Sequence, residues 1–575
     1  MRIGLLTEGV HPYVGGDAGP WCDRLVRGLG QHEFDLYALT LGERQEAEGR
    51  LPLPSQVTRA RTAPSRSPGH DGVVYGRRAR RRFAECYADL VAALCAPASG
   101  DVPAGRRADL PGEAPTGEAD RFAGALYALA ELARDEGGLA GALRSETAVH
   151  VLERACRAPG APRPAHEARV PELLAMAAHL ERALRPLSFD WYEDDRLGAV
   201  DLCHAASGGA AALAGLLARH FLGVPLLVTE YGARLRTYYL ADARTSPPVR
   251  SLLAAFHGRL AAETYRQASV ITAGNAQVRR WQERCGAPRH KIRTVHPGLA
   301  AAPFAKVGEA PERGDPDTLV WVGRVDPAKD LVSLLHAFAQ VRAEEPRTRL
   351  RIVGGPSGPG GAAYLAHCKA LAARLFPAEA AGPHTAGGNP VSFEETGGPD
   401  LPSPADAYAA GAVTVLSSVV EEFPVSLAEA MLCGRATVST DAGAVPEVIG
   451  GTGLVVPPRD PRALARACVA LLRDPERRAR LGAAARARAL ELFTAERSIA
   501  AFHGIYLEIV SHTPVRRVVL DAAGTPLPFG APAEAHVPGR WADAAARAVA
   551  RGTPGWAADA PVRAAAPAPA AEGAR

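Results

Sequence analysis

The chain has 575 residues, which is too long for one hydrophobic core and predicts two or more domains. Its formal net charge is +4 and its basic residues are scattered, which argues against nucleic acid as a partner. Nine dispersed cysteines form no CxxC pair, so neither a disulfide framework nor a zinc site is indicated. We expect a cytoplasmic protein, because the sequence has no signal-peptide pattern and no run of about 18 uncharged apolar residues.

In residues 1–300, short β-branched runs alternate with stretches rich in alanine and leucine. Repeated strand and helix units of this kind predict a parallel sheet covered by helices. The expected strands lie at 2–7, 34–41, 200–205, 225–230, 269–273 and 292–296. The expected helices lie at 18–30, 209–221, 250–267 and 275–285.

Two stretches of this first half do not follow the pattern. Residues 43–80 are polar and interrupted by proline, which predicts an extended loop. Residues 81–185 predict a helical insertion, interrupted by a Gly/Pro/Asp-rich patch at 97–120. The insertion carries no catalytic pattern. We expect it to be a lid, or an addition on the side of the protein that would bind an acceptor substrate.

A second strand and helix series follows an expected polar linker at 300–317. Its strands are expected at 318–323, 350–354, 391–393, 412–417, 436–440 and 453–456. The sequence thus predicts an α/β protein with two doubly wound, Rossmann-like domains, at 1–300 and 318–490. The carboxyl ends of both sets of strands should face one cleft, where such sheets bind ligands. Residues 512–575 are rich in alanine and proline and predict a largely disordered tail.

Two glutamates, Glu421 and Glu429, follow the expected strand at 412–417 and stand eight positions apart. Phe423 and Pro424 mark a turn between them, after which a helix carries Glu429. A helix N-terminus attracts phosphate groups, and a carboxylate on that helix can accept hydrogen bonds from ribose hydroxyls. The pattern therefore predicts a nucleotide-sugar site with Glu421 facing the sugar. The alternative is that both carboxylates are ordinary charges on a loop and an exposed helix face.

Two cations, Arg324 and Lys329, follow the first expected strand of the second domain, at the start of a helix. Lys329 is one of only four lysines in the chain. Arginine offers a bidentate fork to phosphate oxygens, and lysine acts as a point charge. Together they can neutralise a leaving diphosphate, so we expect catalysis without a metal ion or another cofactor. The alternative is a pair of surface cations.

These motifs, in this order, resemble glycosyltransferase family 4, whose members retain the configuration of the transferred sugar and adopt the GT-B fold. The resemblance covers roughly residues 1–45 and 190–510, and rests on Glu421-x7-Glu429 and Trp321-Val-Gly-Arg324-Val-Asp-Pro-Ala-Lys329. Other stretches are similar to the subgroup of the Pel exopolysaccharide glycosyltransferase, which has a DUF3492-type N-terminal domain. They are Glu8-Gly-Val-His-Pro-Tyr-Val-Gly-Gly16, Asp201-Leu-Cys-His204-Ala-Ala-Ser-Gly-Gly209, and Gly355-Pro356 followed by Tyr364-Leu-Ala-His-Cys368.

The resemblance implies roles for residues around the second-domain motifs. Glu429 would bind the ribose hydroxyls, and a helix at 491–511 would return to the first domain. Same-face attack, in which a departing phosphate oxygen takes the acceptor proton, would need no protein base, so Glu421 is not assigned as a nucleophile. The residues expected to contact the diphosphate or the sugar through their backbone are Gly323, Phe423, Pro424, Val425 and Ser426.

The first domain offers weaker candidates. Gly15 and Gly16 would let the backbone approach the diphosphate or the acceptor closely, or would simply form a turn. His204 ends a strand, where it would orient a substrate and take part in catalysis, or would be a satisfied core histidine. Glu230 and Tyr231 would face the sugar or the acceptor, in a Thr-Glu-Tyr-Gly segment where relatives carry Thr-Glu-His-Gly.

The leading hypothesis is a hexosyltransferase that uses a nucleotide-diphosphate sugar, by resemblance a UDP-sugar, and a saccharide or lipid-linked acceptor. It would act in polysaccharide or glycoconjugate synthesis, in the cytoplasm or in a complex at the inner membrane face. Tyr231, and Glu422 in place of a usual glycine, leave open a catalytically impaired relative that senses nucleotide sugar or scaffolds a complex. A nucleotide-sugar 2-epimerase shares the two-domain fold, but the Arg-x4-Lys and Glu-x7-Glu patterns favour the transferase.

Overall fold

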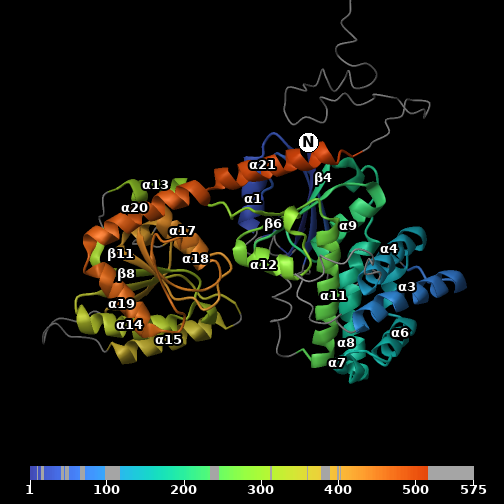
Figure 1. Ribbon diagram of the computed structural model, residues 1–575, viewed down its shortest axis with the longest axis horizontal. Helices are drawn as coiled ribbons and strands as arrows, with labels where there is room; N and C mark the ends of the chain where they lie inside the picture. Colours follow the sequence, from blue (N-terminus) through green and yellow to red (C-terminus); the bar gives the residue numbers. More distant parts are fainter. Residues whose placement is uncertain are drawn as a thin grey trace, which may run out of the picture.

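The computed structural model describes residues 1–9, 11–13, 19–40, 45, 51–64, 72–96, 117–232, 245–310, 314–358, 360–376, 389–397, 401 and 403–515. The chain forms two lobes, each built on one parallel sheet (Figure 1). The helix α20 (Pro475–Leu492) covers the second lobe and α21 (Ala495–His512) lies along the first. Within these described segments, no helix has both the length and the apolar character that a membrane crossing requires.

The first lobe contains a seven-stranded sheet with the order β3-β2-β1-β4-β5-β6-β7. Neighbouring strands are parallel throughout. The strands are β1 (Arg2–Glu8), β2 (Glu33–Thr40), β3 (Val57–Pro64), β4 (Leu202–Ala205), β5 (Leu226–Glu230), β6 (Val270–Ala273) and β7 (Ile292–Thr294). The connecting elements are α1 (Gly19–Gly28), α9 (Ala210–Leu222), α11 (Pro247–Gln267), α12 (Ala276–Arg284) and η3 (Arg289–Lys291).

Two stretches expected to be irregular form regular structure instead. The strand β3 lies inside the expected loop at 43–80, and pairs with β2 at the edge of the sheet. Only Ala63 of β3 is buried, so an apolar pattern could not reveal this edge strand. The expected linker at 300–317 contains α13 (Ala302–Glu309), whose Phe304 is buried, and the start of β8. Most of the expected tail, residues 516–575, lies outside the described residues.

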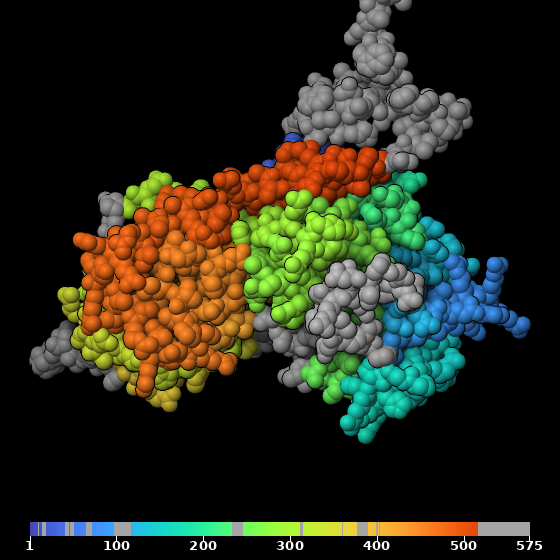
Figure 2. Space-filling view, in the orientation of Figure 1, coloured from blue at the N-terminus to red at the C-terminus, as the bar shows by residue number. Residues whose placement is uncertain are grey.

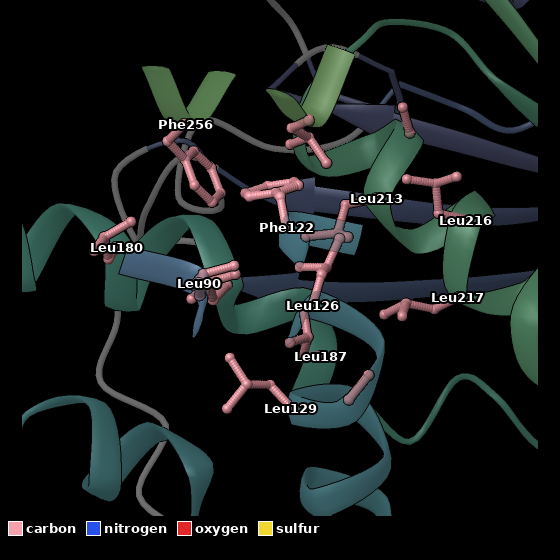
Figure 3. Close-up of a cluster of buried hydrophobic side chains, with 14 of the residues drawn as sticks. Leu90, Phe122, Leu126, Leu129, Leu180, Leu187, Leu213, Leu216, Leu217 and Phe256 are labelled. Carbon is pink, nitrogen blue, oxygen red and sulfur yellow. The ribbon is translucent and has the colours of Figure 1, made fainter. Parts of the chain in front are cut away.

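The insertion of the first lobe is helical and shares its core with the first sheet. Its elements are α3 (Arg77–Cys95), α4 (Glu118–Glu136), α5 (Leu139–Leu143), α6 (Glu146–Cys156), α7 (Arg163–His166), α8 (Val170–Leu184), η1 (Arg185–Ser188) and η2 (Leu197–Ala199). Figure 3 shows Leu126 of α4 close to Leu213 of α9, with Phe122 between them and Phe256 of α11. Because these side chains are fully buried, the insertion is an integral layer of the lobe.

The second lobe contains a six-stranded parallel sheet with the order β10-β9-β8-β11-β12-β13. Its strands are β8 (Asp315–Val322), β9 (Arg349–Val353), β10 (Val391–Glu394), β11 (Gly411–Leu416), β12 (Ala436–Thr440) and β13 (Leu454–Val456). Its other elements are η4 (Pro327–Lys329), α14 (Leu331–Glu344), α15 (Gly361–Leu375), α16 (Pro404–Ala409), α17 (Val425–Leu432), α18 (Val445–Ile449) and α19 (Pro461–Leu472). The strand order reverses between β8 and β11, so the loops that follow these two strands are neighbours.

One junction between the lobes lies where the chain around Leu299 contacts the turn between α20 and α21. Leu299 donates its amide to Phe493 O and accepts from Ala495 N, both at 2.8 Å. A Cβ atom on Gly298 would lie 2.7 Å from Ala495 Cα, so this junction leaves no room for a side chain. From there α21 packs onto the first lobe, where Phe502 and Tyr506 are fully buried. Figure 2 shows α21, in red, over the first lobe and the two lobes in contact beneath it.

Candidate active site

Two loops of the second lobe meet at the point where its strand order reverses. One follows β8 and contains η4, and the other follows β11. The Val419 amide donates to Ala328 O at 2.8 Å, and Ser417 Oγ donates to Lys329 O at 2.7 Å. Because the backbones of the two loops are bonded directly, their side chains are held in a fixed relation to each other.

The centre of this arrangement is an ion pair between Lys329 and Glu421. Lys329 Nζ lies 2.5 Å from Glu421 Oε2, which also accepts from Ser418 Oγ at 3.0 Å. The side chains of Lys329 and Glu421 are 13% and 10% exposed, so the pair is mostly shielded but still reaches solvent. An arriving anion can therefore compete for the lysine, and hydroxyl groups can compete for the carboxylate.

The second predicted carboxylate, Glu429, lies on α17 of the second lobe. Its Oε2 accepts from Tyr408 Oη at 2.8 Å. Burial raises the pKa of Glu429, while Tyr408 and the nearby positive charge of Arg24 oppose that increase. Arg24 belongs to α1 of the first lobe, and burial lowers the pKa of its guanidinium. A carboxylate of the second lobe and a cation of the first are thus close enough for their charges to interact.

The turn that carries Arg324 is shaped by two glycines. Gly323 donates its amide to Val353 O at 3.0 Å. Gly354 has φ +145°, and a Cβ atom there would lie 1.8 Å from Gly323 O, so only glycine allows this approach. Arg324 follows at an exposed position between β8 and η4. The predicted cations therefore occupy the two ends of one short segment.

The residues between the two glutamates form the start of α17. Phe423 and Pro424 are buried, whereas Val425 is 44% exposed at the first position of the helix, directly before Ser426. The Val425 amide donates to Phe423 O at 2.9 Å, so this predicted backbone donor already has an acceptor within its own loop. The ring of Phe423 lies 6.5 Å from that of His296 in the first lobe. This loop is consequently in contact with both lobes.

His204 is not brought together with these residues. It is fully buried, with Nδ1 2.7 Å from Tyr506 Oη and Nε2 2.7 Å from Thr229 Oγ1. Burial lowers its pKa to about 3, so the ring is neutral at ordinary pH. Of the two roles considered from the sequence, this geometry is that of the satisfied core histidine. We therefore give His204 a structural role in joining β4, β5 and α21, in place of the expected catalytic one.

The other first-lobe candidates are also engaged internally. Glu230 Oε2 accepts from Tyr265 Oη at 2.7 Å and from Gln282 Nε2 at 2.9 Å. The ring of Tyr231 packs edge-on against Trp21, at a centroid distance of 5.0 Å, and burial raises the pKa of its hydroxyl. These contacts hold one carboxylate oxygen of Glu230 and the ring of Tyr231 within the lobe, so the sugar-facing role of these residues stays a prediction. Gly15 and Gly16 lie outside the described residues.

Several residues at this site gave no signal in the sequence. Tyr408 reaches Glu429 from α16, Arg24 approaches it from α1, and Asn275 contacts the Glu422 backbone from the start of α12. Each of these contacts joins separate elements, so no local spacing announces it. Ser418 is the exception, because it stands three positions before Glu421 and could have been proposed as its partner.

Comparison with known protein families identifies both halves of the chain. A family model described as "Domain of unknown function (DUF3492)" matches residues 1–290, half of the chain. The chain belongs to this family. A second model, "Glycosyl transferases group 1", matches residues 316–474 of the DUF3492 protein. This second match contains Arg324, Lys329, Glu421 and Glu429, so the site described above lies in a glycosyltransferase domain.

Curated relatives of the DUF3492 protein are glycosyltransferases. The D-inositol 3-phosphate glycosyltransferase of Streptomyces bingchenggensis is 31% identical over 313 residues, which cover 51% of this chain and 64% of the relative. The enzyme of the same name from Thermobispora bispora is 31% identical over 291 residues, covering 47% and 62% respectively. The DUF3492 protein thus matches somewhat less than two thirds of the length of these relatives.

Solved structures share the fold at low sequence identity. Sucrose-phosphate synthase from Thermosynechococcus elongatus has a TM-score of 0.52 and 17% identity, and the match covers 89% of this chain and 100% of that one. The Anabaena protein HepE, solved in complex with UDP, has a TM-score of 0.51 and 14% identity, covering 88% and 99%. The DUF3492 protein therefore has the expected GT-B fold, with two doubly wound α/β domains.

Proposed function

We propose that the DUF3492 protein is a retaining hexosyltransferase that moves a sugar from UDP to a saccharide or lipid-linked acceptor. The observation that carries this proposal is the Lys329–Glu421 ion pair at the strand reversal of a glycosyltransferase group 1 domain. Ligands of doubly wound sheets bind at such a reversal. The names of the curated relatives support the reaction class.

The residues divide the chemistry between them. As the bond from the anomeric carbon to the diphosphate oxygen breaks, Lys329 and Arg324 stabilise the negative charge that develops on the leaving group. The acceptor hydroxyl oxygen bonds to the same face of the anomeric carbon, and its proton passes to a departing phosphate oxygen. Glu421, released from Lys329, accepts hydrogen bonds from the sugar hydroxyls. The products are the glycosylated acceptor and UDP, and no protein nucleophile is needed.

The nucleotide is held mainly by the second lobe. Glu429 has one oxygen fixed by Tyr408 and carries the acceptor capacity that ribose hydroxyls require. UDP is proposed as the nucleotide because the similarly folded HepE was solved with it. We propose that the cations replace a metal ion, so that a chelator should leave turnover unchanged. A role in polysaccharide or glycoconjugate synthesis, in the cytoplasm or in a complex at the membrane, extends the same proposal.

Two observations favour a second candidate, a nucleotide-sugar sensor or scaffold without turnover. A Cβ atom on Gly232 would lie 2.2 Å from Glu422 Oε2, so the carboxylate of Glu422 rests against the first lobe. A bulky charged side chain therefore stands beside the expected sugar position, where the family resemblance implies a glycine. The partly buried Tyr231, at a position where the resemblance implies a histidine, also favours this candidate.

A binding and turnover experiment separates these candidates. UDP, GDP and ADP, each free and with glucose attached, are compared by thermal shift, since a ligand that binds only the folded state raises its stability. Saturation with UDP at about 100 times its Kd should add about 2.7 kcal/mol to the free energy of unfolding, and the nucleotides with other bases should add less.

Turnover is measured as slow hydrolysis of UDP-sugars. It should be lost in Glu421→Gln but kept in Glu476→Gln, which changes an exposed carboxylate of α20. Tight UDP-sugar binding without turnover, even beside acceptor-containing extracts, would support the sensor.

A further inference from the structure

The start of α12 in the first lobe is bonded to the loop that holds Glu421 in the second. Asn275 is fully buried and uses both ends of its side-chain amide. Its Oδ1 accepts from Val278 N at 2.9 Å, which caps α12, and its Nδ2 donates to Glu422 O at 2.9 Å. One side chain therefore fixes its own helix and, across the lobe boundary, a carbonyl directly next to Glu421.

A second contact reinforces the first. The Ala276 amide, which is one of the unpaired donors at the start of α12, donates to Glu447 Oε2 of the second lobe at 2.7 Å. The carboxylate is also favoured there by the positive end of the helix dipole. We call the bonds Asn275–Glu422 and Ala276–Glu447 the interlobe clasp.

The backbone of the loop that contains Glu421 is also tightly packed against its own lobe. Gly443, which precedes α18, has φ +60°, and a Cβ atom on it would lie 1.5 Å from Glu421 O and 3.2 Å from Gln277 Oε1. The loop with Glu421 is thus packed between a glycine turn of its own lobe and the first turn of α12. A displacement of the start of α12 should therefore also displace the Glu421 side chain.

We propose that Asn275 is a positioning residue, which holds Glu421 in place for the sugar when the lobes are in contact. This inference rests on the proposed function, because Glu421 faces the sugar only in that assignment. Nucleotide binding depends on Lys329, Arg324 and Glu429, all of which belong to the second lobe, so the clasp should affect the sugar step and not UDP affinity. The two lobes are thereby coupled through hydrogen bonds between side chains and main chain, and not through the substrate alone.

The decisive variant is Asn275→Ser. Serine is a good N-cap and preserves α12, but it is too short to reach Glu422 O. UDP affinity should remain within about twofold of wild type, whereas kcat for UDP-glucose hydrolysis should fall roughly tenfold, as expected for one lost hydrogen bond. The matched control is Asp460→Ser, because Asp460 caps α19 in the same way and lies within the second lobe. Equal losses of UDP affinity and kcat, or unchanged kcat, would overturn the proposal.

Hydrogen exchange tests the clasp without any substrate. In Asn275→Ser, the amides of residues 418–423 should exchange faster, while those of α12 keep their protection. Glu447→Ala should have the same effect, and Glu447→Gln, which keeps an oxygen acceptor, should remain near wild type. Unchanged exchange at residues 418–423 would overturn the clasp whatever the protein catalyses. If wild type binds no UDP or UDP-glucose, the proposed function fails, and faster exchange in the variant would still support the mechanical coupling.

Discussion

The strand ends of the two lobes carry similar residue types but use them in different ways. In the first lobe, His204 and Glu230 direct their polar atoms to Tyr506, Thr229 and Tyr265, all within the packed interior. In the second lobe, Lys329 and Glu421 bond to each other at a partly exposed rim. The comparison teaches that a polar residue at a strand end serves function when its bonds can be exchanged for bonds to a ligand.

Exchangeability has an energetic basis. A fully buried polar group that loses its partner costs about 1–3 kcal/mol, and water cannot enter to replace the partner. The His204 bonds are of this kind, because the ring is fully buried. At the rim of the second lobe, a diphosphate or a sugar hydroxyl can arrive as one bond breaks. The following predictions test this division between structural and exchangeable groups.

The largest effect is expected for Lys329→Ala. Loss of a preorganised cation next to the leaving group should lower kcat for UDP-sugar turnover by about 10²–10³-fold. The exposed Lys369 gives the matched control. Lys369→Ala removes the same charge from α15, which is not part of the two loops that meet at Glu421. Steady-state kinetics of both variants measure the difference. Similar activity in the two variants would show that Lys329 is an ordinary structural cation.

A smaller effect is expected for Glu429→Gln. Hydrogen bonds to a charged group contribute about 1.5–3 kcal/mol, so UDP affinity should fall roughly 10- to 100-fold. Because burial raises the pKa of Glu429, wild-type affinity should decline as the pH falls through that raised value, where the carboxylate becomes protonated. The Gln variant should lack this decline. Calorimetric titration with UDP across pH measures both, and an identical pH dependence in the variant would contradict the role.

The smallest effect on activity is expected at His204. His204→Ala should lower stability by about 2–4 kcal/mol, since it removes a buried ring and the hydrogen-bond partner of the Tyr506 hydroxyl, while the Thr229 hydroxyl keeps only Thr272. The kcat of the folded protein should be unchanged. His204 has a pKa near 6.5 in the unfolded state and about 3 in the folded state. Between these two values the unfolded state binds more protons, so the free energy of unfolding of wild type decreases by about 1.4 kcal/mol for each pH unit that the pH falls. Denaturation of the variant across pH should show a shallower decline. A changed kcat with unchanged stability would restore His204 to the active site.

Much of the fold could be predicted from the sequence, because buried parallel strands are short apolar runs. All six expected strands of the second domain are present, and the four charged residues singled out there lie in or beside two touching loops. That site was visible because Arg324 and Lys329, and Glu421 and Glu429, are each close together in sequence.

The remainder could not be predicted, because it depends on contacts between distant parts of the chain. Asn275 and Glu422 are 147 positions apart, and His204 and Tyr506 are 302 positions apart. No spacing rule connects such pairs. The edge strand β3 was missed for a related reason: it is defined by its pairing with β2 and not by an apolar pattern of its own.

The position of α21 has a consequence for how this protein can be divided. The apolar core around β1 and α1 includes Phe502, Ile505 and Tyr506 of that helix. The first lobe is therefore discontinuous in sequence. A fragment that ends at residue 290 would lack α21 and would expose the apolar groove that this helix covers. Exchange of whole lobes between related proteins, in evolution or in chimeras, would succeed only when the last helix travels with the beginning of the chain.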